Sequence, residues 1–229
     1  MLRNLVKLTL ICTLINFHFA FGEYTLKLRL IDYINYQRKL QDHTCCDRFV
    51  GPCEDCDPVL EICVSDEQAI KRVNNNTIDC NLGLFETKEY TDKNYIRFGT
   101  LLGPLLSNPI IIYGARKWKG QISIRIIIHE MDDGQKSKII NDFQATSYHK
   151  AAPRITTARE QVMEPLVGPQ DSELSYAIRI FCSNYYFGSD CSKYCKPADD
   201  NRTGHFTCDR HGNKVCRKGF KGPHCKTMI

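Results

Sequence analysis

Cysteine is the residue type with the most chemistry to offer in this sequence, because 13 of its 229 residues are cysteines. Thiolates bind zinc or do redox chemistry in reducing compartments, whereas in oxidising compartments they pair as disulfides. Twelve of the cysteines fall into two groups of six, namely Cys45, Cys46, Cys53, Cys56, Cys63 and Cys80, and then Cys182, Cys191, Cys195, Cys208, Cys216 and Cys225. The compartment therefore decides which of these chemistries applies.

The N-terminus predicts export from the cell. Arg3 and Lys7 are followed by a mostly apolar run that ends at Phe21, and Ala20 and Gly22 place small residues before a cleavage site. The run is shorter than the roughly 20 residues that span a bilayer, which favours a cleaved signal peptide over a retained anchor. We therefore expect residues 1–22 to be removed and the mature protein to be secreted and extracellular.

Removal of residues 1–22 also removes Cys12 and leaves an even number of cysteines, as complete pairing requires. Zinc at Cys53-x-x-Cys56 is the less favoured alternative in such a compartment. The spacing leaves the pairing of the first six cysteines open, and it also leaves fifteen possible pairings for the second six.

The sequence offers no catalytic motif. Neither an HExxH helix nor a GxSxG elbow occurs, and we expect neither an enzyme nor a bound cofactor or metal. Asp132 and Asp133 follow a strand and could contribute oxygens to a calcium ion, but solvated turn residues are the favoured interpretation. A formal net charge of +5 is too small to indicate a nucleic-acid-binding protein.

Alternating apolar residues predict that residues 23–181 form an antiparallel β-sandwich. The strongest strand is Gln121–Met131, which is rich in β-branched residues. Thr157-Ala158-Arg159-Glu160 has the form of a helix capping box, and Pro165 would end the helix. The other expected strands are Glu23–Leu30, Val59–Val64, Tyr95–Phe98, Ile110–Tyr113 and Ser175–Cys182.

Residues 182–225 differ from the preceding part in kind. They contain no leucine or isoleucine and only one valine, Val215, so their core is too small to fold without disulfides. They also carry eight Lys and Arg residues against four Asp and Glu residues, a positive charge that would steer an acidic partner or simply keep the segment soluble. We expect its five glycines, Gly188, Gly204, Gly212, Gly219 and Gly222, to occupy turns with positive φ.

The pattern of this segment resembles the receptor-binding DSL module of the Delta/Serrate family of Notch ligands. It begins with Cys182-Ser-Asn-Tyr-Tyr-Phe-Gly, continues through Lys196-Pro-Ala-Asp-Asp and Gly204-His-Phe-Thr-Cys, and ends with Gly219-Phe-Lys-Gly-Pro-His-Cys225. The first six cysteines and Trp118-Lys-Gly-Gln-Ile-Ser-Ile resemble the C2-like sandwich that precedes the module in this family. The resemblance implies an all-β protein with a signal peptide at 1–22, a C2-like sandwich at 23–181 and a small EGF-like DSL module at 182–225.

The resemblance also implies site residues and partners. The pairs in the module would be Cys182–Cys191, Cys195–Cys208 and Cys216–Cys225. The partner would be the extracellular repeats of a Notch-type receptor, with a membrane-tethered co-ligand as a further partner. The residues that would face the receptor are Tyr185, Tyr186, Lys196, Asp200, Arg202, Thr203, His205 and Phe206. The alternative for Tyr185, Tyr186 and Phe206, as for Phe220, is that they cover the disulfides as a miniature core.

Two features depart from the family pattern. The loop Asn201-Arg202-Thr203 replaces one that commonly holds an exposed aromatic, and the sequence stops four residues after Cys225, where relatives continue into EGF-like repeats, a membrane span and a tail. Asn201 and Asn75 are the expected N-glycosylation sites. We expect a short secreted ligand or co-ligand that modulates cell–cell signalling in development. The alternatives are an antagonist of tethered ligands and a lipid-surface-binding adhesion module.

Overall fold

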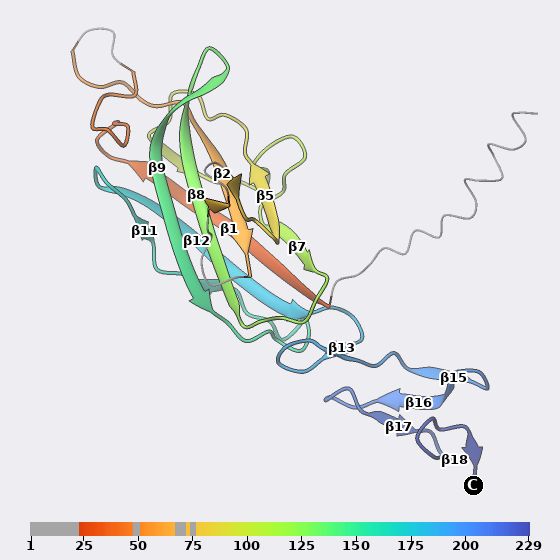
Figure 1. Ribbon diagram of the computed structural model, residues 1–229. Helices are drawn as coiled ribbons and strands as arrows, with labels where there is room; N and C mark the ends of the chain where they lie inside the picture. Colours follow the sequence, from red (N-terminus) through yellow and green to blue (C-terminus); the bar gives the residue numbers. More distant parts are fainter. Residues whose placement is uncertain (1–22, 48–50, 67–71, 74–76) are drawn as a thin grey trace, which may run out of the picture.

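The computed structural model describes residues 23–47, 51–66, 72–73 and 77–229. The expected signal peptide, Cys12 and Asn75 lie outside these residues. Every regular element of the described chain is a β-strand, and none of its segments forms a helix that could cross a membrane. The elements form a two-layered sandwich from one end of which a small second unit continues (Figure 1).

The first sheet is built on two long antiparallel strands, β1 (Tyr24–Asn35) and β12 (Ser172–Cys182). Tyr24, Leu26 and Leu28 of β1 are buried while the residues between them face outward, as the period of two in the sequence predicts. Four short strands pair with these two, namely β6 (Tyr95–Arg97), β7 (Ile110–Gly114), β10 (Gln161–Val162) and β11 (Leu166–Val167).

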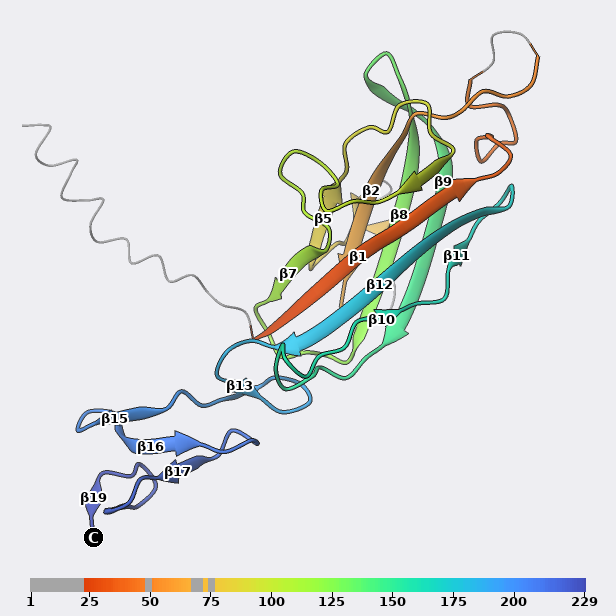
Figure 2. The same ribbon diagram turned by 180° about the vertical axis from the view of Figure 1, so that it is seen from behind.

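The second sheet has the strand order β5-β2-β8-β9 and packs over the inner face of the first (Figure 2). Its strands are β5 (Gly83–Glu86), β2 (Pro58–Ser65), β8 (Gln121–Asp132) and β9 (Gln135–Tyr148). A further short pair joins β3 (Arg72–Val73) to β4 (Thr77–Ile78). The antiparallel sandwich is confirmed, and each of the six strands expected from the alternation is present.

A buried polar network connects the two sheets. The Tyr33 hydroxyl on β1 donates to Asn141 Oδ1 on β9 at 2.6 Å, and Asn141 Nδ2 donates to Ser172 Oγ on β12 at 2.8 Å. Asn141 and Ser172 have no exposed surface, so these bonds offset the cost of burying their polar groups. The network fixes β9 against the first sheet.

The expected helix at Thr157–Glu160 is absent, and that prediction is wrong. Thr157 and Ala158 donate their backbone N–H groups to the carbonyl of Arg154, which closes a turn. Glu160 does not reach back to Thr157 but forms two hydrogen bonds with the guanidinium of Arg29 on β1, at 2.7 and 2.9 Å. The carboxylate that suggested a capping box therefore anchors the segment to the sheet.

Residues 183–229 form three small antiparallel sheets around a core of aromatic rings and sulfur. Phe187, Cys195, Phe206 and Cys225 are buried together, with Phe220 packed against them. The strands are β13 (Tyr186–Phe187) with β14 (Lys193–Tyr194), β15 (Ala198–Asp200) with β16 (Gly204–Cys208) and β17 (Lys214–Cys216), and β18 (Phe220–Lys221) with β19 (Thr227–Met228). Aromatic side chains and disulfides thus replace the aliphatic core that the composition lacks.

The join between the two units is packed and has no flexible linker. Strand β12 ends at Cys182, whose bonded partner Cys191 is buried in the sandwich core. Trp118 donates its backbone N–H to the Asp190 carbonyl and its ring N–H to the His149 carbonyl, both at 2.7 Å. These contacts hold the start of the second unit against the end of the sandwich.

Candidate functional site

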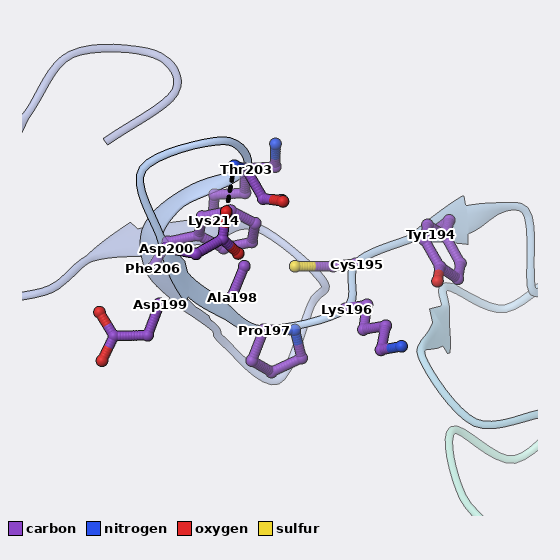
Figure 3. Close-up of a pocket in the computed structure, with 10 residues that line it drawn as sticks. All are labelled: Tyr194, Cys195, Lys196, Pro197, Ala198, Asp199, Asp200, Thr203, Phe206 and Lys214. Atoms are coloured by element: carbon purple, nitrogen blue, oxygen red, sulfur yellow. Dashed lines mark hydrogen bonds between the residues drawn. The ribbon is translucent and has the colours of Figure 1, made fainter. Parts of the chain in front are cut away.

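The second unit contains a cavity of about 590 Å³ beside the β15–β16 turn (Figure 3). Lys196, Asp200, Thr203 and Phe206 are among its lining residues. We call it the loop cavity. It brings together four of the eight residues that the resemblance assigns to receptor binding.

The turn that shapes the loop cavity is fixed by Asp200. Its Oδ1 accepts hydrogen bonds from the backbone N–H groups of Arg202 at 2.8 Å and Thr203 at 2.6 Å. Hydrogen bonds to the charged carboxylate lower the pKa of Asp200. The chain then turns back through Gly204, which has φ of +119°, and a Cβ there would lie 2.1 Å from the His224 carbonyl oxygen. The other four expected turn glycines also have positive φ, so that prediction is confirmed.

Phe206 lies beneath the cavity rather than at its rim. It is 2% exposed and belongs to the core of the unit, and the ammonium of Lys214 lies 4.5 Å from its ring centroid. A partner in the cavity would meet Lys214 more than Phe206, because Phe206 is almost fully covered. Truncating Phe206 would therefore test the fold of the unit before it tested binding.

His205 faces a different group of side chains. Its Nδ1 lies 2.6 Å from Asp199 Oδ1 and its Nε2 lies 3.2 Å from Asn201 Oδ1, while its ring stacks on Phe220 with 3.9 Å between ring centroids. It lines neither the loop cavity nor the groove described next. Its position supports a role in holding the turn that carries Asn201.

Tyr185 and Tyr186 open onto a second hollow, of about 750 Å³, between the second unit and the outer face of the first sheet. We call it the junction groove. Cys195 and Pro197 line both hollows, so the two adjoin one another. Tyr185 is 44% exposed, and the ammonium of Lys196 lies 5.6 Å from its ring centroid.

No motif in the sequence indicated that the sandwich contributes to this surface. Lys27 on β1 and Tyr113 on β7 line the junction groove, as does the segment of residues 153–156. Tyr194, which is 57% exposed, was also missed, although an aromatic between two cysteines in Cys191-Ser-Lys-Tyr-Cys195 is a visible signal. Exposed aromatic side chains therefore lie beside a cation on this surface.

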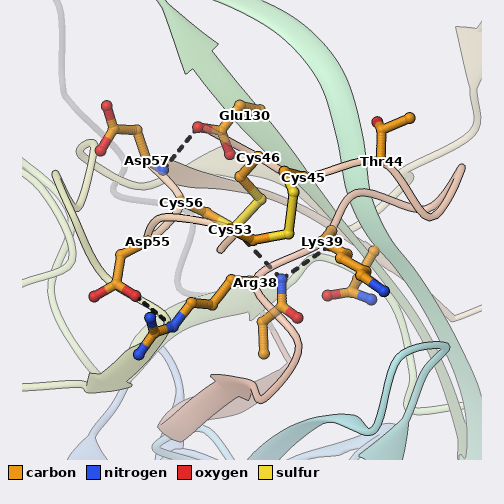
Figure 4. Close-up of a disulfide and its surroundings, with 12 residues drawn as sticks. Arg38, Lys39, Thr44, Cys45, Cys46, Cys53, Asp55, Cys56, Asp57 and Glu130 are labelled. Atoms are coloured by element: carbon orange, nitrogen blue, oxygen red, sulfur yellow. Dashed lines mark hydrogen bonds and ion pairs between the residues drawn. A yellow bond between two sulfur atoms is a disulfide. The ribbon is translucent and has the colours of Figure 1, made fainter. Parts of the chain in front are cut away.

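All twelve described cysteines are bonded. The second unit contains Cys182–Cys191, Cys195–Cys208 and Cys216–Cys225. The first group forms Cys45–Cys53, Cys46–Cys56 and Cys63–Cys80. Four of the first six cysteines staple the β1–β2 connection at the end of the sandwich away from the second unit (Figure 4).

A buried acid, Glu130, lies beside these staples. It is 1% exposed, its Oε1 accepts from the backbone N–H of Asp57 at 2.9 Å, and its Oε2 is buried without a hydrogen-bond partner. Desolvation, together with the charges of Asp47, Asp57 and Asp132, raises the pKa of Glu130 to about 7. In the sequence this position lies within the expected strand Gln121–Met131, with no motif that marks it.

Two groups of described side chains at this end could approach a metal. Cys46 and Cys56 lie with Glu130, but their sulfurs are bonded to each other and carry no thiolate. Asp47, Glu130 and Asp132 bring one oxygen each within 4.8 Å of one another. Calcium takes six to eight oxygens, so these three would complete about half of its coordination. Asp133 is in the turn that follows, with φ of 51°.

Comparison with known families matches both units of the chain. Residues 23–180 match the sequence model described as the N terminus of Notch ligand C2-like domain, and residues 182–228 match the one described as Delta serrate ligand. Delta-like protein 1 of Rattus norvegicus is 28% identical over 99% of this chain and 31% of its own length. The Homo sapiens Delta-like protein 1 is 30% identical over 89% of this chain and 28% of its length. The chain thus spans about a third of these curated relatives.

Solved structures support the fold. A structure of Drosophila C2-DSL-EGF1 superimposes with a TM-score of 0.62 at 23% identity, over 90% of this chain and 87% of that one. A C2 domain protein from Ramazzottius varieornatus superimposes with a TM-score of 0.51 at 12% identity, over 70% of this chain and 89% of that one. The first shares the order of sandwich and module, and the second shares the sandwich.

Proposed function

We propose, since this chain belongs to the Delta/Serrate family of Notch ligands, that it binds the extracellular repeats of a Notch-type receptor and modulates cell–cell signalling in development. A ligand function agrees with the matched family, whose members are signalling ligands rather than enzymes. The observation that carries the proposal is the presence of both family units in one chain, matched over residues 23–180 and 182–228.

The proposed binding face consists of the loop cavity and the junction groove. Lys196, Asp200 and Thr203 would present the loop cavity, while Tyr185 and Tyr186 would extend the contact into the groove. Arg202 is exposed in the turn and would contact the receptor at the rim of the loop cavity. Phe206 and His205 would act by positioning this turn, since one is buried in the core and the other is stacked on Phe220.

We place the boundary between the units at Cys182 and propose that residues 1–22 direct export. Asn201 would carry an N-glycan. Asn201 is exposed, and its contact with His205 uses Oδ1 and not the amide nitrogen to which a glycan attaches. The glycan would then stand beside the loop cavity and limit which partners reach it.

Antagonism of tethered ligands is the second form of this function. The purified chain, added in solution, would occupy a receptor without pulling on it, so in that form we expect it to act as a co-ligand or as an antagonist. A co-ligand and an antagonist would use the same surface, which consists of the loop cavity and the junction groove.

A titration of purified chain onto immobilised EGF-like repeats of a Notch-type receptor tests the proposal. We expect saturable binding that Lys196→Glu weakens at least fivefold, because Lys196 supports the Tyr185 ring and lines the loop cavity. Lys218→Glu is the matched control, since Lys218 is an exposed cation of the same unit that lines neither hollow. Absence of saturable binding by the wild-type chain would contradict the proposal.

Reporter cells that express the receptor complete the test. Purified chain added to cells without any other ligand should leave the reporter silent, and added to cells with a tethered ligand it should change the signal. Activation by the soluble chain alone would show that no tether or partner is required.

A further inference from the structure

The floor of the junction groove is the outer face of the first sheet. Strand β1 lies between β7 and β12, and the core residues Leu26 and Leu28 point to the opposite face. The registers place two rows of three side chains across this outer face. The first row is Tyr113, Thr25 and Phe181, and the second is Ile111, Lys27 and Arg179.

The second row places two cations directly opposite each other on neighbouring strands. Lys27 is the register partner of Arg179, and like charges in such a pair destabilise a sheet. No carboxylate of the described chain forms an ion pair with either residue. The nearby Glu160 is held by Arg29, and Arg179 Nη2 donates to the Ile155 carbonyl at 2.6 Å. Glu160 thus acts on Arg179 only through its charge, without an ion pair, and Lys27 has no ion-pair partner among the described residues.

The groove as a whole carries the same sign. Lys27 and Arg154 are among its 18 lining residues, none of which is an aspartate or a glutamate. The Phe181 ring partly stabilises the positive charges of Lys27 and Arg179, since Lys27 Nζ lies 6.0 Å and Arg179 Cζ 5.9 Å from the ring centroid. A carboxylate of a bound partner would neutralise the positive charge of the groove.

The apolar residues that line the junction groove limit which class of partner would bind there. Tyr113 is 59% exposed, Ile155 46% and Ile111 41%, and all three line the groove. A sulfated glycan would neutralise the cations but would leave these side chains against water. A peptide that carries both carboxylates and apolar side chains would match both kinds of lining.

We propose that the junction groove binds an acidic polypeptide segment in which carboxylate and apolar side chains alternate, with a carboxylate beside Lys27. The assignment of this segment to the receptor rests on the proposed function, whereas the preference of the groove itself does not. The contact would bridge the sandwich and the second unit, because residues 183–187 form one wall of the groove.

A fluorescent peptide of alternating Asp and Leu residues tests the preference by anisotropy with the whole chain. We expect saturable binding that weakens about tenfold between 50 and 500 mM salt, because screening acts on exposed charges. A matched peptide of alternating Asn and Leu should not bind.

The variant Lys27→Glu tests whether peptide binding can be lost while the protein stays folded. It should weaken peptide binding at least tenfold, and its thermal midpoint should equal or exceed that of the wild type, because the new carboxylate faces Arg179. Lys218→Glu should bind the peptide as the wild type does. Peptide binding that is unaffected by Lys27→Glu, or no peptide binding at all, would overturn the proposal.

The titration with receptor repeats separates this proposal from the proposed function. If wild type and Lys27→Glu bind the repeats equally, the assignment of the acidic segment to the receptor fails and the receptor function stands. If the acidic peptide binds through Lys27 but the repeats do not, the groove stands and the receptor proposal fails. Heparin binding that depends on Lys27, without peptide binding, would assign the groove to a sulfated glycan and overturn the peptide proposal.

Discussion

At the scale of single residues, the least expected side chain is Glu130. Its carboxylate is buried next to the Cys46–Cys56 disulfide and has one hydrogen bond for its two oxygens. Burial raises the pKa of Glu130 from its ordinary 4.5 to about 7. The folded state therefore favours the protonated acid, and its ionisation destabilises the fold.

The pH dependence that follows has a definite sign. The contribution of Glu130 to stability is fully present below pH 4.5, where both states are protonated, and is lost as the pH rises through about 7. Glu130→Gln keeps an oxygen for the Asp57 N–H but cannot ionise. At pH 8 we expect this variant to be more stable than the wild type by about 2 kcal/mol, a difference that disappears near pH 4.

Urea denaturation at both pH values, with EDTA present to remove divalent cations, measures this difference. Glu173→Gln is the control, since Glu173 is an exposed carboxylate on β12. A Glu130→Gln variant that is equally or less stable than the wild type at pH 8 would show that the Glu130 carboxylate is ionised at no cost.

At the scale of elements, alternation predicted the strands whose buried residues are apolar, and it failed where they are polar. Strand β9 is the longest in the molecule and was not predicted, because Asn141 occupies a fully buried position and irregular register with β8 interrupts the period. The capping box at Thr157–Glu160 failed because Arg29, about 130 residues away in sequence, binds the glutamate. Contacts of this range leave no local signal.

The difference between local and long-range contacts also explains which residues of the site could be predicted from the sequence. The loop cavity is formed by one short part of the sequence, residues 194–214, so four of its residues could be named from a motif, although Tyr194 and Lys214 were not. The junction groove joins Lys27, Tyr113 and Tyr185, which only the strand registers and the packed join bring together. The sequence could therefore indicate the part of the proposed face that the second unit supplies, Tyr185 and Tyr186 included, but not the part that the sandwich supplies.

The join between the units depends on Trp118. This tryptophan is 2% exposed, packs edge-on against Tyr24 with 5.0 Å between ring centroids, and donates a hydrogen bond to each side of the join. We expect Trp118→Ala to lower the free energy of unfolding by about 3–5 kcal/mol, because it leaves a large cavity. Circular dichroism during chemical denaturation measures the loss.

Tyr148→Ala is the matched aromatic control at the end of β9, where the side chain is 70% exposed, and it should change stability by about 0.5 kcal/mol or less. If Trp118→Ala lost less than about 1 kcal/mol, the join would depend on other contacts, such as the Cys182–Cys191 disulfide.

At the scale of the whole molecule, the two units differ in charge and in packing. Residues 182–225 carry an excess of cations, while the sandwich supplies the core and the ordered join. The two hollows adjoin at Cys195 and Pro197 and therefore form one continuous face on which a partner would meet both units. The Cys45–Cys53 and Cys46–Cys56 staples lie at the opposite end of the sandwich, away from this face.

Hydrogen–deuterium exchange of the chain, alone and saturated with the receptor repeats, tests this binding face most directly. We predict slower exchange in the complex at residues 194–206, at 183–187 and in β7, with no change around the staples of the β1–β2 connection. Protection confined to the staple end of the sandwich, or to strands β2 and β5, would contradict the account.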